Sequence, residues 1–288
     1  MALFGLNYNK PGPGISKDEP QKTALFRFFG IFTAKFWDLL KINMIYFVSI
    51  FIFFIPVVYV GLAYVYDKNL TSYMRNPMFY LIILASCLPI ICTGPFTAGF
   101  TYVMRNFVRR EHVFLWSDFK DIAKANIKQS ILATLVNVVI YILIGTNICF
   151  YFFNMKSNEM MSIPFVFFIL ALFIFFSMNF YVYTMIVTFD LKLRQIYKNA
   201  LIFSTAGILR NILISVIIAL IVALNVYIPA LLFLIPFFTL SLIGLIMNFG
   251  SWPMIQRYMI DSVKNNDSSE LQTETIFQDV GREKKKKS

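Results

Sequence analysis

The chain has 288 residues, of which 58% are apolar and only 14% are charged. A soluble domain has roughly 45–50% apolar and about 25% charged residues, so the composition excludes a water-soluble globular protein and indicates lipid as the main solvent. The net charge is +11, but the basic residues lie between apolar segments, where they set membrane orientation. We therefore expect a membrane protein that does not bind nucleic acid.

The two ends of the chain differ in composition from the region between them. Residues 1–22 contain the alternating Pro-Gly run Pro11–Gly14, which is incompatible with a regular helix. Residues 259–288 are polar and carry both signs of charge, a composition typical of disorder. The sequence predicts a polar arm over 1–22, an all-helical membrane domain over 23–258 and a disordered cytoplasmic tail over 259–288.

Residues 23–41 have the pattern of an amphipathic helix that lies in the plane of the membrane surface. Arg27, Asp38 and Lys41 fall on one side of such a helix. The apolar residues recur at helical spacing on the other side: Leu25, Phe28, Phe29, Phe32, Phe36, Leu39 and Leu40.

Six apolar segments follow, and each is long enough to cross a bilayer, which takes about 20 helical residues. The uncharged stretch 211–256 is too long for one crossing and has a turn signal at Asn225–Pro229. The predicted spans are 42–66, 76–104, 129–155, 160–189, 211–227 and 230–250.

The distribution of basic residues predicts the orientation. Of the 26 Lys and Arg residues, only Lys68, Arg75 and Lys156 lie in the loops on one side of the membrane. Basic residues concentrate on the cytoplasmic side, so we expect both termini in the cytoplasm of a bacterial plasma-membrane protein.

The segments that open the first, third and fifth spans resemble one another. Residues 37–43, 121–126 and 195–199 are each a cationic amphipathic turn that includes or ends near Asn. This pattern suggests three helix-plus-hairpin units. Cytoplasmic helix starts share such composition in any case, so both explanations stay open.

The stretch from Thr93 to Lys128 is the most informative part of the chain, because an apolar span runs into a basic, aromatic connection there. Pro89, Gly94 and Pro95 make the second span the best candidate for a helix break, which in transporters can bind a solute. A packing kink is the plainer interpretation. The connection supplies the candidate contacts for lipid or a partner protein: Arg105, Arg109, Arg110, Glu111, His112, Trp116 and Asp118.

Motifs for chemistry are weak. Ser117 and Lys120 match the S-x-x-K spacing of penicillin-binding enzymes, but the companion motifs are absent and Ser117 is better explained as a helix N-cap. His112 is the only histidine, and a metal site usually needs three or four ligands. We expect no catalytic residue, no metal and no cofactor.

No charged residue lies in the inner part of any predicted span, which argues against an ion-coupled transporter. The polar residues that remain there are explained by interhelical hydrogen bonds: Asn137, Asn147, Asn179, Asn211, Asn225 and Asn248.

Four stretches of the chain resemble the YesL family of bacterial membrane proteins. They are residues 7–17, residues 36–43, Gly94-Pro95 with Arg105 and 109–119, and 188–191 with 197–200. The usual family pattern has glycine where this chain has Arg110. The resemblance implies a multi-span plasma-membrane protein of Firmicutes whose relatives are encoded beside carbohydrate ABC importers.

The resemblance thus favours a non-catalytic accessory subunit or regulator of carbohydrate import. It would contact a sugar ABC permease or its ATPase through the connections 23–41, 105–128 and 190–210. The alternatives are a small-solute transporter or channel that uses the second span, and an enzyme that uses Glu111, His112 and Asp118. Membrane lipid is a further expected partner, and the oligomeric state is open.

Overall fold

A computed structural model describes residues 23–66, 88–155 and 158–261 of the chain. In these ranges the chain is helical and contains no strand, as predicted. The principal helices are α1 (Ala24–Ala34), α2 (Phe36–Tyr66), α5 (Leu88–Arg109), α6 (Leu115–Ala125), α7 (Ile127–Asn154), α8 (Ser162–Ile186), α9 (Leu193–Ala206), α10 (Ile208–Tyr227) and α11 (Leu240–Ile255). Short 3-10 turns cover Glu159–Met161 and Pro229–Leu234, and π-helical turns cover Ile235–Thr239 and Gln256–Asp261.

Four of the described helical segments are long and apolar enough to cross a membrane. They are Ile127–Asn154, Glu159–Ile186, Ile208–Tyr227 and Pro229–Asp261, and they coincide with the third to sixth predicted spans. The first predicted span lies within the 31-residue helix α2. The second begins outside the described residues, at 76–87, and continues in α5, so the count of six spans stays a prediction.

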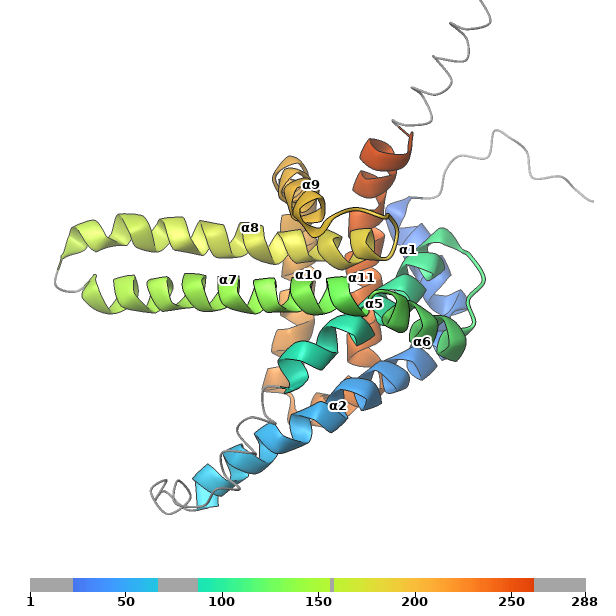
Figure 1. Cartoon of the computed structure of the whole chain (residues 1–288), viewed down its shortest axis with the longest axis horizontal. Coiled ribbons are helices and arrows are strands. Elements are labelled where there is room, and N and C mark those ends of the chain that lie inside the picture. The colour runs from blue at the N-terminus through green and yellow to red at the C-terminus, as the bar shows by residue number, and fades with distance from the viewer. Residues whose placement is uncertain (1–22, 67–87, 156–157, 262–288) are drawn as a thin grey trace, which may run out of the picture.

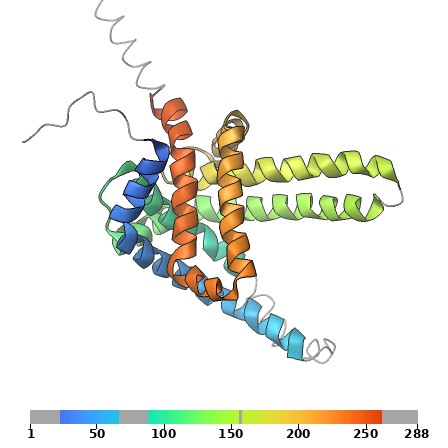
Figure 2. The same cartoon turned by 180° about the vertical axis from the view of Figure 1, so that it is seen from behind.

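The long helices form pairs that run in different directions. Helices α7 and α8 lie side by side as a hairpin, and α10 and α11 run crosswise to it, behind α7 and α8 in Figure 1 and in front of them in Figure 2. Helix α5 lies between these pairs and contacts α2, α6, α7, α8 and α11. It is therefore the central helix of the described structure.

The surface of these helices is largely apolar, as expected of helices that lie in a membrane. Only 11% of the most apolar window in each of α7 and α8 is buried inside the protein. Large side chains such as Phe153 and Ile163 are more than 70% exposed. Apolar patches of this extent are rare on soluble monomers, and a hydrocarbon environment removes their cost.

Each short helix joins the following long helix through a single residue. Lys35 joins α1 to α2 with φ −111° and ψ 14°, Asn126 joins α6 to α7 with −105° and 14°, and Gly207 joins α9 to α10 with −98° and 24°. The predicted single helix over 23–41 is therefore wrong: it is divided at Lys35, and 36–41 forms the first part of α2. The amphipathic pattern continues across the division because helical hydrogen bonds do: the Lys35 N–H donates to the Ile31 carbonyl, and the Lys35 carbonyl accepts from the Leu39 N–H.

The candidate break in the second span is not seen in its described part, because α5 remains α-helical through Gly94 and Pro95. Pro89 lies in the same helix. Gly94 instead permits a close approach of α7: a Cβ atom there would lie 2.5 Å from the carbonyl oxygen of Ser130 and against Thr134 Oγ1. The plainer interpretation, a packing role, is the one the geometry supports.

Replacing Gly94 with valine should destabilise the protein by roughly 1–3 kcal/mol, because the added atoms would force α5 and α7 apart. The measurement is thermal unfolding of the detergent-solubilised protein. Gly145→Val is the matched control, since a Cβ at Gly145 meets no atom within 4 Å. Equal unfolding temperatures for the two variants would contradict the close approach.

Candidate functional site

The C-terminal end of α5 is closed by a turn centred on Arg110. The Arg110 N–H donates to the Phe107 carbonyl at 3.0 Å, and the Glu111 N–H donates to the Asn106 carbonyl at 2.9 Å. This pair of bonds is the Schellman motif, whose central residue is usually glycine in the left-handed conformation. Arg110 is the one non-glycine residue with positive φ, 58°, in the described ranges. The turn therefore forms with arginine at the position where the family pattern has glycine.

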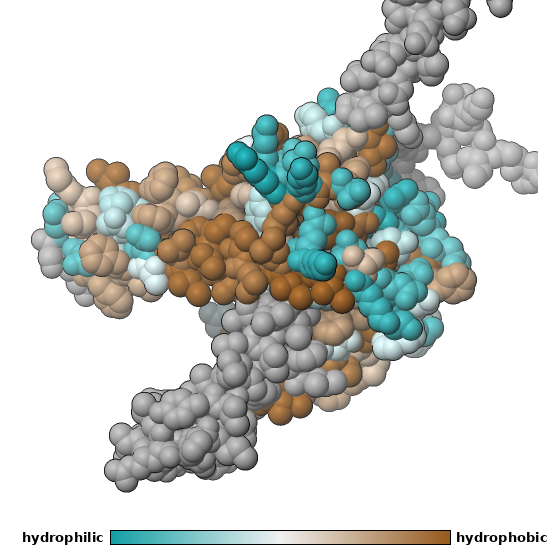
Figure 3. Space-filling view, in the orientation of Figure 1, coloured by the Kyte–Doolittle hydropathy of each residue, from teal (hydrophilic) through white to brown (hydrophobic). Residues whose placement is uncertain are grey.

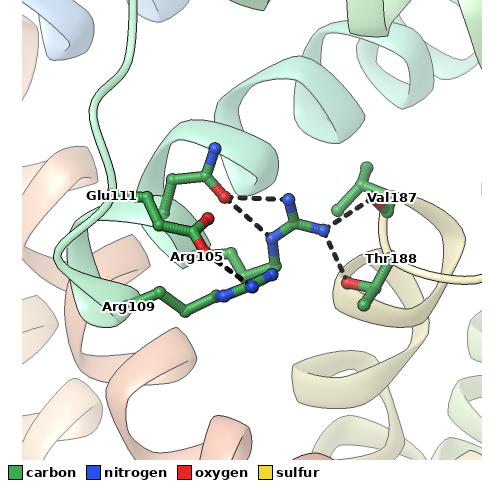
Figure 4. Close-up of polar contacts among 6 residues, drawn as sticks. Arg105, Arg109, Glu111, Val187 and Thr188 are labelled. Atoms are coloured by element: carbon green, nitrogen blue, oxygen red, sulfur yellow. Dashed lines mark hydrogen bonds and ion pairs between the residues drawn. The ribbon is translucent and has the colours of Figure 1, made fainter.

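Arg105 is buried one helical turn before the end of α5. Its Nη1 donates to the Val187 carbonyl at 2.8 Å and to Thr188 Oγ1 at 2.9 Å. Its Nε and Nη2 donate to Asn106 Oδ1, as Figure 4 shows. The guanidinium also lies over the Tyr102 ring, 4.6 Å from its centroid. Arg105 thus binds the C-terminal end of α8, where a positive charge also complements the helix dipole.

The environment of Arg105 is unusual for a cation, because no carboxylate is in ion-pair contact with it among the described residues. Burial, and next the neighbouring charge of Arg109, lower the pKa of Arg105 from its ordinary value. Hydrogen bonds to oxygen atoms offset the cost of burying this charge. With 6% of its surface exposed, Arg105 is not the surface contact that the sequence suggested.

Arg109 is exposed, but its guanidinium makes two contacts within the protein. It forms an ion pair with Glu111 (Figure 4), and its guanidinium lies 5.1 Å from the ring centroid of Trp252 in α11. Such cation–π contacts contribute about 0.5–2 kcal/mol. Arg109 therefore links the end of α5 to α11, and Glu111, whose side chain is partly exposed, binds Arg109 from the same turn.

The remaining predicted contact residues are exposed on the connection to α6. Arg110, His112 and Trp116 are exposed, and the His112 ring packs edge-on against the exposed Phe114 ring at 4.8 Å. We call Arg110, His112, Phe114 and Trp116 the exposed connection surface. No hydrogen bond or ion pair joins the side chains of Glu111, His112 and Asp118 to one another.

Helix α6 begins differently from the prediction. Its N-cap position is Phe114, and Ser117 lies in its first turn, so the interpretation of Ser117 as the N-cap is wrong. The side chain at the N-cap position makes no capping bond. Instead, a side chain inside the helix bonds the backbone of the N-cap residue: the Asp118 carboxylate accepts a hydrogen bond from the Phe114 N–H at 3.0 Å. Asp118 is favourable there because its negative charge lies near the positive end of the helix dipole.

Several structural residues were not recognised as partners of the site. Thr188 receives a hydrogen bond from Arg105, and the Tyr197 hydroxyl donates to Asn137 Oδ1 at 2.7 Å. Thr188 and Tyr197 both lie in stretches that carry the family resemblance. The sequence therefore marked these residues, but it did not indicate which residues they would bond. Asn43 was also missed: its amide bonds the Ile235 carbonyl and the Ser241 N–H, which ties α2 to the start of α11.

The interhelical role predicted for the polar residues in the spans is confirmed for most of them. Asn137 donates to Asn179 at 2.6 Å, Asn211 accepts from the Tyr181 hydroxyl at 2.8 Å, and Asn248 accepts from Thr184 at 3.1 Å. Asn225 accepts from Thr239 at 3.4 Å. Asn147 is the exception, since it donates to the Leu143 carbonyl of its own helix.

Residues 73–148 match the model of a family described as "Protein of unknown function, DUF624". The matched segment contains α5, α6, their connection and most of α7. Comparison with curated proteins and with solved structures finds no match.

Arg110→Gly should stabilise the protein by about 1 kcal/mol, because an L-residue in the left-handed region costs roughly 1–2 kcal/mol that glycine avoids. The unfolding temperature in detergent measures this gain. Arg110→Ala is the control for loss of the charged side chain, since it keeps a Cβ at positive φ. An equal change in both variants would assign the effect to the charge instead of the backbone.

Proposed function

We propose that this chain is a non-catalytic membrane accessory subunit or regulator that acts through protein contacts on its connection side. One observation carries the proposal: Arg105 binds the end of α8, Arg109 lies against Trp252 of α11, and Glu111 and Asp118 are bonded within the connection and the start of α6, whereas the exposed connection surface has no such role. A cationic and aromatic surface of this kind matches the residue types enriched at protein interfaces, Arg and aromatic residues.

The assignment to carbohydrate import is based on the family resemblance. Arg105 and the run 109–119, which carry the resemblance most specifically, all lie inside the segment matched by the DUF624 model. On this proposal the partner is a sugar ABC permease or its ATPase in a bacterial plasma membrane. The alternative of a small-solute channel required an interrupted second span, and the continuous α5 with α7 packed against Gly94 removes its main support.

We further propose three helix-plus-hairpin units, which give six spans and cytoplasmic termini. The units would be α1 with α2 and α5, α6 with α7 and α8, and α9 with α10 and α11. The closely similar backbone angles at Lys35, Asn126 and Gly207 support this division. The positive-inside distribution of charge supports the orientation.

The orientation predicts which positions an impermeant thiol reagent can reach in intact cells. In a chain whose own cysteines are replaced by serine, Asn69→Cys and Ser157→Cys should be labelled, and Ser268→Cys should be labelled only after permeabilisation. Labelling of Ser268→Cys in intact cells would contradict cytoplasmic termini.

The partner is tested by affinity purification from native membranes in mild detergent, followed by mass spectrometry. A sugar importer should be recovered with the wild-type protein. The double variant His112→Ala/Phe114→Ala should reduce recovery at least severalfold, because truncating interface aromatics typically removes 1 kcal/mol or more.

The matched control is Phe153→Ala/Met160→Ala, which truncates two residues of similar exposure at the far end of the α7–α8 hairpin. Equal recovery with both double variants would place the partner elsewhere. Failure to recover any importer with the wild-type protein would refute the assignment to carbohydrate import.

A further inference from the structure

A groove opens between α6 and the neighbouring parts of α2, α5 and α7. Its volume is about 330 Å³, within the range of small-ligand pockets. Phe96 of α5, Phe119 of α6 and Ile131 of α7 line it, together with Ser49 of α2. The groove belongs to none of the contacts that hold the end of α5 to α8 and α11.

The walls of the groove suit a hydrocarbon chain. The Phe96 and Phe119 rings are stacked, with centroids 6.2 Å apart and planes 6° from parallel. The Ser49 hydroxyl donates to the Ile45 carbonyl of its own helix, so it does not need a polar ligand. An occupant of this groove therefore gains from apolar contact and not from hydrogen bonds.

The rim of the groove is cationic. Lys120 and Lys124 line it from α6, four residues apart, and both ammonium groups are without an ion pair among the described residues. On the same helix the Asp118 carboxylate accepts from the Phe114 N–H and the Asp121 carboxylate from the Ser117 hydroxyl, and neither forms an ion pair with these two lysines. Like charges at this spacing repel each other, so an anion placed between them is favourable.

The groove lies where the polar and the apolar surfaces of the described structure meet. Hydrophilic side chains gather over α6 and the preceding loop, beside the apolar surface of the α7–α8 hairpin (Figure 3). Trp116 lines the groove and is 60% exposed, which is typical of tryptophan at the headgroup level. The lysines can thus reach headgroups while their methylene stems stay against apolar surface.

We propose that this groove binds an anionic phospholipid, with one acyl chain between α2, α5, α6 and α7 and the phosphate between Lys120 and Lys124. The groove complements such a lipid in two ways: its apolar walls contact the acyl chain, and the two lysines attract the phosphate. Trp116 borders both this groove and the exposed connection surface, but the test uses the purified chain alone, so its outcome does not depend on the proposed importer partner.

The experiment measures lipid binding to the full chain in mild detergent by native mass spectrometry, with phosphatidylglycerol and phosphatidylcholine of identical acyl chains. Phosphatidylglycerol should bind about tenfold more tightly, since each lysine near an anionic lipid contributes favourably. Lys120→Gln/Lys124→Gln should abolish this preference. Arg194→Gln/Lys198→Gln, which removes the same charge from an exposed face of α9, should leave it unchanged.

Two further arms keep the proposal decisive if the lysine variant does not fold. Ser49→Leu fills the groove without changing charge and should weaken binding of both lipids, and soluble glycerol phosphate should not compete. Equal wild-type affinity for the two lipids, an equal loss in both charge variants, or unaffected binding by Ser49→Leu would overturn the proposal. Full competition by glycerol phosphate would assign the lysines to a free phosphate instead.

Discussion

The arrangement of helices depends on how α5 is held at its C-terminal end. There the buried guanidinium of Arg105 donates to a backbone carbonyl and a hydroxyl at the end of α8, while Arg109 stacks on Trp252 of α11. Three helices from distant parts of the chain are thereby fixed at one point. A buried charge is tolerated only when its donors are satisfied, so this junction also restricts how α5 and α8 can slide past one another.

Polar side chains perform the same task deeper in the protein. Between helices surrounded by hydrocarbon, hydrophobic burial gives little driving force, and association relies on close packing and interhelical hydrogen bonds. Asn43, Asn137, Asn211 and Asn248 each supply such a bond. Gly94 and Gly99 provide the close packing, since the backbone of α7 lies against the first and that of α6 against the second.

The residues between the end of α5 and the start of α7 fall into two groups, those that take part in contacts within the protein and those that remain on its surface. Some of the charged residues face inward and are saturated by contacts, whereas Arg110, His112 and Phe114 stay on the surface and Lys120 and Lys124 border an apolar groove. The proposed functions follow from the second group alone. Both proposals place the activity at the boundary between membrane and cytoplasm, where the chain would bind a protein partner and a lipid.

The sequence by itself determined the solvent, the helical class and the positions of the third to sixth predicted spans, because length and hydropathy of a segment are local properties. It also indicated that the Thr93–Lys128 stretch was central. Only the tertiary structure decided that Gly94 and Pro95 lie in a continuous helix, that the helix predicted over 23–41 is divided at Lys35, and that Arg105 is buried. Those outcomes depend on contacts between residues that are far apart in the sequence. Thr188, for example, lies 83 positions from Arg105. A local sequence pattern cannot indicate which distant oxygen atom a guanidinium will bind.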